Sequence, residues 1–137
     1  MADNLSPLYL LDTNICIYAM NGQTSVLQKF KAHGKAALAI SSLVMAEMAY
    51  GVAKSQRIAE NTTALKRFQA SFNILPWDTT AMWHYGKHCH LLKSTGQKIG
   101  EVDLLLGCQA LALDAIFVTN NTREFERIEG LKLENWV

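Results

Sequence analysis

A chain of 137 residues is long enough for one folded domain with a substantial core. Half of the residues are hydrophobic and 18% are charged, a composition that excludes an intrinsically disordered or low-complexity protein. The formal net charge of +1 gives no nucleic-acid-binding signature by itself, but the chain has 13 Lys and Arg, so gathering several of its 12 acids in one pocket would leave a basic surface elsewhere.

The N-terminal sequence and the cysteines predict a cytoplasmic protein without a membrane segment. The opening residues "MADNLSP" lack the basic region of a secretory signal, and the apolar run that follows is interrupted by Asp12 and Asn14. Cys16, Cys89 and Cys108 are odd in number, widely spaced and set among apolar neighbours. Reduced core thiols are therefore expected rather than a disulfide framework.

Strand-like and helix-like segments alternate through the first half of the chain. A buried strand over residues 8–11 ends at Asp12, and a helix is expected over 15–32. A second buried strand over 36–41 closes at Ser41, and Ser42 is the expected N-cap of the helix that follows it. A further helix is expected over 59–72, and "NILPW", residues 73–77, predicts a third strand.

The alternation continues to the C-terminus. Asp78 or Thr79 is expected to cap a helix that ends near residues 94–96, and another helix should run from about Gly100 to Asp114. The remaining elements are a strand over 115–119, a short capped helix over 121–128 and an edge strand over 131–136. The pattern predicts an α/β sandwich around a central, mainly parallel sheet, in which ligands bind beyond the carboxyl ends of the strands.

Asp12 stands at one of these strand ends. The sequence Asp-Thr-Asn also favours a turn and a helix cap. Taken alone, the position of Asp12 therefore leaves open a purely local role as a helix cap.

Glu47 is a second candidate. Leu43, Ala46, Glu47 and Tyr50 share one face of a helix, which predicts that Glu47 points inward. An inward carboxylate is costly unless it is paired, neutralised or bound to a metal, and Lys54 is the one cation on this helix that could reach it. The alternative is a glutamate at the helix edge that reaches water.

Two more acidic regions follow. Glu101 and Asp103 begin a helix, where its dipole favours negative charge by about 0.3–1 kcal/mol. The dipole suffices to explain Glu101, whereas Asp103 directly precedes the buried body of the helix and is expected at the mouth of the core. Asn121 and Glu124 have the spacing of a capping box, and the functional alternative is that they add oxygen ligands to the same pocket.

Several carboxylates at one edge would repel one another, and burial would raise their pKa values until some were protonated. A divalent cation removes this repulsion, and Mg²⁺ or Mn²⁺ is expected because both prefer oxygen ligands. Zinc is not expected, because the Cys and His residues lack the usual ligand spacings. His84 and His88 are four residues apart, but no Glu follows His84 as metalloprotease chemistry requires.

Four segments, in order, resemble the PIN domain and specifically the VapC toxins of bacterial toxin–antitoxin pairs: "LLDTNICI", "SSLVMAEMAYG", "GEVDLLLGCQAL" and "FVTNNTREF". The resemblance covers nearly the whole chain and implies a single PIN domain over residues 1–137 with a PIN-like α/β/α sandwich. It also implies a Mg²⁺- or Mn²⁺-dependent endoribonuclease, usually a homodimer. A small VapB antitoxin would neutralise it in a larger complex that binds its own promoter DNA.

The resemblance assigns roles residue by residue. Asp12, Glu47 and Asp103 match the family's catalytic, metal-binding acids. Asn121 stands where the family commonly has Asp, which puts a second tightly held metal in doubt, and Glu124 is expected to compensate by holding a water beside the metal. Thr13, Asn14, Thr119 and Asn121 match supporting polar residues.

The implied reaction is in-line attack of a metal-activated water on a phosphodiester, leaving a 5′ phosphate and a 3′ hydroxyl. "DTNICI" and "TNNTREFER" resemble the enteric subgroup that acts on initiator tRNA, so its anticodon loop is the expected substrate. The candidate phosphate contacts are Lys54, Arg57, Lys98 and Arg123, although a solvated surface explains each of them equally well.

Two alternatives belong to other functional classes. A receiver-like phosphoacceptor domain also places Asp at strand ends, but it requires paired acids after the first strand and a Lys after the last, where this chain has Asn14 and Asn120. A catalytically inactive PIN-like module that binds RNA or protein is the stronger alternative, because Asn121 is neutral.

Overall fold

Five short strands form the centre of the molecule in the computed structural model, which describes residues 7–137. The opening segment 1–6, where no secretory signal is expected, lies outside the described residues. The strands lie side by side in the order β3-β2-β1-β4-β5 and every pairing is parallel, which confirms the predicted mainly parallel sheet. Their bounds are β1 Tyr9–Leu11, β2 Leu38–Ser41, β3 Asn73–Leu75, β4 Ile116–Val118 and β5 Lys132–Glu134.

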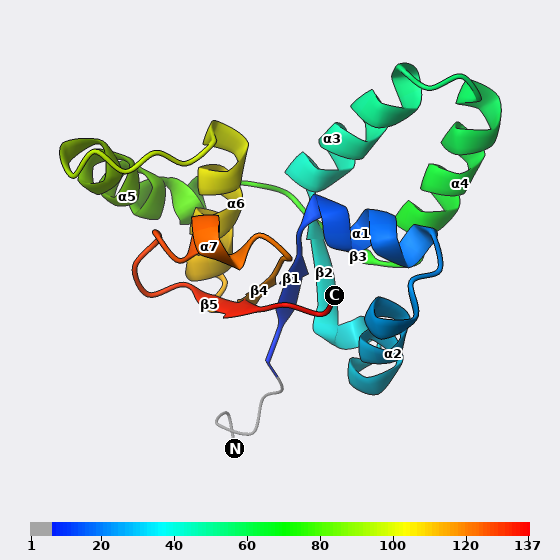
Figure 1. The fold of residues 1–137 in the computed structure, drawn as a ribbon, viewed down its shortest axis with the longest axis horizontal. Helices are drawn as coiled ribbons and strands as arrows, with labels where there is room; N and C mark the ends of the chain where they lie inside the picture. Colours follow the sequence, from blue (N-terminus) through cyan, green and yellow to red (C-terminus); the bar gives the residue numbers. More distant parts are fainter. Residues whose placement is uncertain (1–6) are drawn as a thin grey trace.

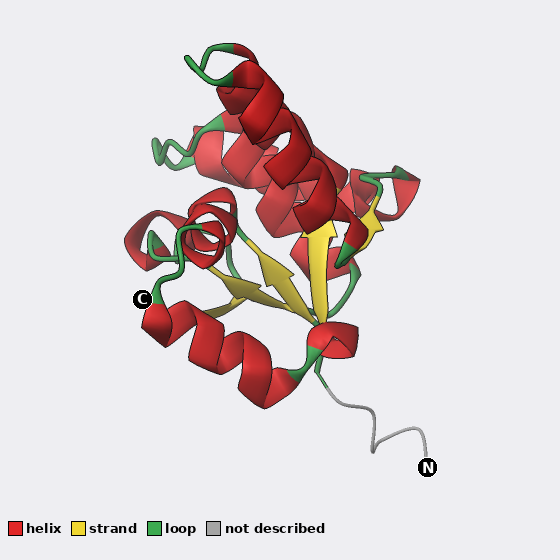
Figure 2. Cartoon of the chain, turned by 90° about the vertical axis from the view of Figure 1, so that its right-hand side faces the viewer, coloured by secondary structure: helices red, strands yellow, loops and turns green. Residues whose placement is uncertain are grey.

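Helices cover the sheet from both sides (Figures 1 and 2), which confirms the predicted α/β/α sandwich. Helices α3 and α4 form an antiparallel pair that projects from the sheet, here called the α3–α4 hairpin, while α5 and α6 lie on the opposite side of the molecule (Figure 1). The helices of residues 7–137 are α1 Thr13–Met20, α2 Thr24–His33, α3 Ser42–Ala53, α4 Ile58–Ala70, α5 Met82–Ser94, α6 Glu101–Ala112 and α7 Thr122–Phe125, with 3₁₀ turns η2 Lys35–Ala37 and η3 Thr79–Ala81.

The single helix expected over 15–32 is two helices, so that prediction was wrong. Gly22 has φ +79°, which an L side chain rarely adopts, and it follows the C-terminal cap of α1. The amide of Gln23 donates to the carbonyl oxygen of Tyr18 at 2.9 Å, which closes the end of α1 before α2 begins. Gly22 was therefore a helix stop signal within an otherwise helical pattern.

The predicted cap of α3 was displaced by one residue. The hydroxyl of Ser41 accepts from the amide of Leu43 at 3.1 Å, while that of Ser42 accepts from the amide of Trp77 at 3.2 Å. Asp78 is a cap as predicted, because its carboxylate accepts from the amide of Thr80 at 3.0 Å and starts η3. Strand β3 is shorter than predicted and ends at Leu75, directly before Pro76, which has no amide proton for a sheet ladder.

The helix expected over 121–128 is a single turn, α7, and its predicted capping box does not form. The side chain of Asn121 makes no cap hydrogen bond and instead donates from Nδ2 to Oε2 of Glu124 at 2.6 Å. The side chains of Asn121 and Glu124 therefore do not cap this one-turn helix and can bind neighbouring elements.

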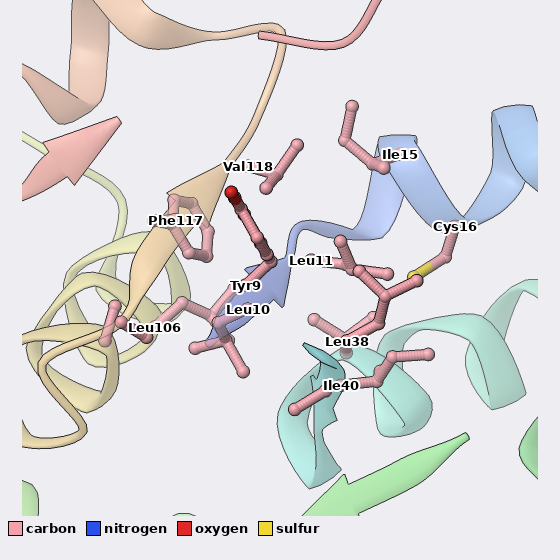
Figure 3. Packing of buried hydrophobic residues seen from close by; sticks show 14 of the residues in the cluster. Tyr9, Leu10, Leu11, Ile15, Cys16, Leu38, Ile40, Leu106, Phe117 and Val118 are labelled. Carbon is pink, nitrogen blue, oxygen red and sulfur yellow. The ribbon is translucent and has the colours of Figure 1, made fainter. Parts of the chain in front are cut away.

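The core lies on both faces of β1, the central strand. Leu10 and Leu11 are fully buried, and Figure 3 shows Leu11 beside Ile15 and Cys16 of α1, with Phe117 and Val118 on the adjacent strand β4. Burying each such side chain contributes about 1.5–3 kcal/mol to stability, so the central strand is a rigid base for the residues that follow it.

The three cysteines are free thiols, with Cys16 and Cys108 buried and Cys89 half-buried. Burial is the main cause that raises the pKa of the Cys16 thiol, and it raises the pKa of Cys108 to about 12. Among the described residues, no helix combines the length and the apolar character needed to cross a membrane.

Candidate active site

Asp12 occupies the carboxyl end of the central strand. Its amide donates to the carbonyl oxygen of Val118 at 2.9 Å, which extends the β1–β4 pairing by one residue, and the residue is only 7% exposed. Oδ1 accepts from the amide of Thr13 at 2.8 Å and Oδ2 accepts from the hydroxyl of Thr119 at 2.8 Å. Asp12 is thus the N-cap of α1, as the local alternative required, and is also fixed toward β4.

Glu47 lies on the α3–α4 hairpin, where its Oε1 accepts from the hydroxyl of Thr13 at 2.7 Å. The prediction that it points into an apolar core was wrong: Glu47 is exposed, and Tyr50 on the same face is 66% exposed. The face of α3 that packs on the core carries Val44 and Met48 instead. Because the hairpin projects from the sheet, its other face meets solvent, and Glu47 reaches the site from its edge.

Thr13 joins these two acids. Its amide binds the carboxylate of Asp12 and its hydroxyl binds that of Glu47, so one residue fixes both groups. Lys54, the cation considered for Glu47, lies over the ring of Tyr50 with Nζ 4.7 Å from the ring centroid.

Asp103 lies in the first turn of α6 and is half-buried. Burial, followed by the negative charges of Glu124 and Asp12, raises the pKa of Asp103 to about 7. Burial also raises the pKa of Asp12, although its hydrogen bonds with Thr119 and Thr13 oppose the shift. Asp12 and Asp103 are thus carboxylates that burial keeps away from water, next to other carboxylates.

Glu124 connects three segments of the site. Its Oε1 accepts from the amide of Gly100 at 3.1 Å, directly before α6, and its Oε2 accepts from the amide group of Asn121 at 2.6 Å. The backbone amide of Asn121 in turn donates to the hydroxyl of Thr119 at 3.0 Å. A chain of hydrogen bonds therefore runs from Asp12 through Thr119 and Asn121 to Glu124.

The other predicted site residues lie outside this series of hydrogen bonds. Asn14 is exposed, and within the described part of the protein no hydrogen bond joins its side chain to the acids. Arg123 is next to Glu124 on α7, and the carbonyl oxygen of Lys98 accepts from the guanidinium of Arg127. Lys54 and Arg57 instead stand at the turn of the α3–α4 hairpin, where Arg57 pairs with Glu60.

Sequence reasoning missed two contributions. Gly100 acts through its backbone amide, which no side-chain pattern reveals. Tyr18 accepts at its hydroxyl from the side-chain amide of Asn120 at 3.2 Å, which holds the segment after β4 against α1. The sequence could have pointed to Tyr18, because it lies on α1 one helical turn after Asn14.

The arrangement fits a hard divalent cation. In residues 7–137 the ion pairs are Arg57–Glu60 and Lys132–Asp114, so neither lysine nor arginine neutralises Asp12, Glu47, Asp103 or Glu124. Within this region no three Asp, Glu, His or Cys side chains lie in an arrangement that could already hold a metal ion. An open set of oxygen donors linked through Thr13 and Asn121 suits an ion such as Mg²⁺, which keeps several waters.

Comparisons with known proteins agree with this geometry. The PIN-domain family model matches residues 9–131. Over 131 residues the chain is 40% identical to ribonuclease VapC2 of Rickettsia felis, with 94% of this chain and 98% of the relative covered. The chain belongs to the VapC family of PIN-domain ribonucleases. The tRNA(fMet)-specific endonuclease VapC of Shigella flexneri is 38% identical to it over 130 residues, which cover 93% of this chain and 97% of that relative.

Solved VapC structures share the fold. The structure of VapBC2 from Rickettsia felis bound to a DNA fragment from their promoter matches with a TM-score of 0.88 and 39% identity, covering 95% of this chain and 99% of that chain. DNA-bound VapBC from Salmonella typhimurium matches with a TM-score of 0.90 and 31% identity, covering 96% and 100%. Ribonucleases of the PIN fold use divalent metal ions. Membership of the VapC family makes this chain an endoribonuclease, and an inactive binding module is not favoured.

Proposed function

We propose that this chain is the toxin component of a type II toxin–antitoxin system, acting as a single PIN domain over residues 1–137. It cleaves structured RNA, with the anticodon loop of initiator tRNA as the leading substrate, and thereby inhibits translation. The observation that carries the proposal is the convergence of Asp12, Glu47, Asp103 and Glu124 from four separate elements at the end of the sheet. The tRNA substrate is supported by a relative that is a tRNA(fMet)-specific endonuclease.

The proposed cofactor is Mg²⁺, which Mn²⁺ can replace, held by Asp12, Glu47 and Asp103. When bound, the ion supplies positive charge to the scissile phosphate and lowers the pKa of water, both of which favour phosphodiester hydrolysis. All three ligands offer oxygen. Burial, followed by the negative charges of Glu124 and Asp12, raises the pKa of Asp103, and a cation would neutralise that charge.

Protein groups then position the reactants. Glu124, held by Gly100 and Asn121, orients the attacking water and accepts its proton. Thr119 and Thr13 keep the carboxylate of Asp12 in place. Asn14 lies exposed in the first turn of α1, next to Thr13. In-line attack leaves a 5′ phosphate and a 3′ hydroxyl.

The RNA approaches over basic side chains at two places. Lys98 and Arg123 are close in the chain to Gly100 and Glu124, whereas Lys54 and Arg57 mark the turn of the α3–α4 hairpin. Phosphate contacts at both places would orient the substrate across the acids. Because tRNA is the proposed substrate, the proposed location is the cytoplasm.

A VapB-type antitoxin is the proposed partner. A groove of about 320 Å³ lies between α1, α3 and α4, with an apolar lining that includes Ile17, Met48 and Leu65 and with Thr13 and Glu47 at its edge. An apolar segment of the antitoxin in this groove would cover one side of the acids. We further propose a homodimer that joins the antitoxin in a higher-order complex, with operator DNA bound only through the antitoxin, in line with the DNA-bound VapBC relatives.

Purified, antitoxin-free protein tests the proposal. Incubated with total tRNA and Mg²⁺ or Mn²⁺, it should cut initiator tRNA, and mapping of the RNA ends should place the cut in the anticodon loop. Chelator and Asp12→Asn should each abolish cleavage, while Asp114→Asn, an exposed acid paired with Lys132, should cleave normally. Intact RNA in the presence of either metal would overturn the proposal, and cleavage of other RNAs alone would overturn the tRNA assignment.

A further inference from the structure

A pocket lies between α5, α6 and the segment that joins them, residues 95–100. Its volume is about 330 Å³, at the lower end of the range for small-molecule sites, about 300–1,000 Å³. Its apolar surface comes from Tyr85, Leu92, Ile99 and Leu104. The ring of Tyr85 meets that of Trp77 edge to face, with the ring centroids 6.5 Å apart, so it is a supported flat surface.

The polar groups around this pocket carry both charges. Lys93 and Lys98 contribute positive charge, and Gln97 and Glu101 contribute an amide and a carboxylate. Tyr85 and Glu101 line the same pocket. The pKa of Tyr85 is raised mainly by a hydrogen bond with Cys89 and by burial.

The pocket adjoins the acids through the first turn of α6. Glu101 and Leu104 face the pocket, while Asp103, on the same turn, shares its space with Asp12 and Glu124. The joining segment is fixed on the acid side, where Gly100 donates to Glu124 and the carbonyl of Lys98 accepts from Arg127. The pocket and the acids are therefore separated by one helix, whose diameter with side chains is about 10–12 Å.

We propose that this pocket receives an unpaired nucleobase of the RNA next to the scissile phosphate, and that it selects a base with an amino group over uracil. The inference rests on the proposed ribonuclease function and assigns it a specificity site. Single-stranded RNA is recognised by splaying bases onto aromatic side chains and by hydrogen bonds to their edges. Tyr85 supplies the stacking surface, and Lys93 and Lys98 face the flanking phosphates.

Glu101 gives the pocket its selectivity. An ionised carboxylate only accepts hydrogen bonds, and adenine, cytosine and guanine each present an amino donor. Uracil has no amino group, its only edge donor is N3–H, and it presents a carbonyl oxygen, which a carboxylate repels, where cytosine carries its amino group. The charge balance favours RNA over an apolar peptide segment as the ligand. Such a peptide would offer no anionic partner to Lys93 and Lys98.

Cleavage kinetics test the selectivity. RNA hairpins that differ only in the base on either side of the cut are compared by kcat/KM in Mg²⁺. At one of these positions the protein should prefer an amino base to uracil, and Glu101→Gln should reduce that preference at least about 5-fold. Tyr85→Leu should lower kcat/KM for the preferred hairpin about 5- to 100-fold, mainly through KM, while Tyr85→Phe retains it. Glu129→Gln, an exposed acid outside the pocket, is the matched control.

Binding of nucleoside 5′-monophosphates provides a readout that needs no cleavage. In amide NMR spectra of the metal-free protein, AMP, CMP or GMP should shift the signals of residues 93–101 more than UMP does. Equal shifts from all four, or none at these residues, would overturn the pocket assignment, as would base preferences unchanged in both Glu101→Gln and Tyr85→Leu. If RNA stays intact with metal, the proposed function fails, and the titration still decides the pocket.

Discussion

The hydroxyl of Thr119 donates to Oδ2 of Asp12 at 2.8 Å, and the two residues are 107 positions apart in the chain. Thr119 is fully buried at the end of β4 and Asp12 is nearly so at the end of β1. Parallel pairing of the two strands brings their carboxyl ends together, so the contact follows directly from the topology.

Thr119→Val should separate the role of this hydrogen bond from that of packing. The variant keeps the side-chain shape but leaves Asp12 with one donor fewer, so stability should fall by about 1 kcal/mol and cleavage by a larger factor than stability explains. Denaturant unfolding and kcat measure the two effects. Thr119→Ser restores the hydroxyl and should recover most of the activity; equal activity in the Val and Ser variants would contradict the role.

Asp103→Asn should abolish cleavage without weakening the fold. Neutralising one of several clustered acids relieves their repulsion, so the melting temperature of the metal-free protein should stay equal or rise. Asp12→Asn should behave in the same way. Asp114→Asn, which neutralises an exposed acid elsewhere, should change stability by less than about 0.5 kcal/mol. Loss of folding in either site variant would instead indicate a purely structural acid.

The stability of the metal-free protein should depend on pH through Asp103. Its pKa is raised from 3.8 to about 7, so between these values the folded state binds more protons than the unfolded state. The contribution of Asp103 to stability is therefore present below about pH 4 and is lost as the pH rises to about 7. Unfolding in urea at pH 5, 6 and 7.5 should show this decline, and Asp103→Asn should reduce its slope. Identical slopes in both proteins would contradict the shift.

Metal binding should stabilise the fold through the same acids. An ion that binds only the folded state raises stability according to its concentration relative to Kd. Millimolar Mg²⁺ or Mn²⁺ should therefore raise the melting temperature of the wild type, and chelator should reverse the rise. NaCl at matched ionic strength controls for screening. A similar rise in Asp12→Asn would show that the ion binds elsewhere.

Gly107→Ala tests the packing behind the site. A Cβ at Gly107 would clash with Cδ1 of Ile128, which is buried, whereas Leu131 would stay at ordinary contact distance. Overpacking of this kind costs about 1–3 kcal/mol. Ile128→Val removes the clashing atom, so the double variant should lose less stability than the sum of the two single variants. Strict additivity in denaturant unfolding would show that Ile128 moves aside freely.

Much of this architecture could be predicted because short apolar runs end in polar residues. Asp12 and Thr119 directly follow buried strands, and alternation with helices indicates that those strands are parallel. Asp103 could be predicted as well, since an acid directly before a buried helix body has few other positions to occupy. These inferences depend on local sequence and on one general property of parallel sheets.

The errors arose where distant segments decide the outcome. The orientation of Glu47 depends on the angle at which the α3–α4 hairpin projects from the sheet. Helical periodicity in the sequence gives no information about that angle. Ser42 was displaced as a cap because Trp77, 35 residues later, donates to its hydroxyl. Asn121 and Glu124 had the spacing of a capping box, but Glu124 is bound by Gly100 from the other side of the site.

The hydrogen bond between Thr13 and Glu47 gives the acids unequal freedom. Asp12 is buried at the sheet, whereas Glu47 is exposed on a projecting hairpin and is held there by one solvent-exposed contact. Breaking such a contact costs little, because water replaces it. Asp12 is thus a fixed point of the site and Glu47 an adjustable one, so the width of the catalytic opening follows the tilt of the α3–α4 hairpin.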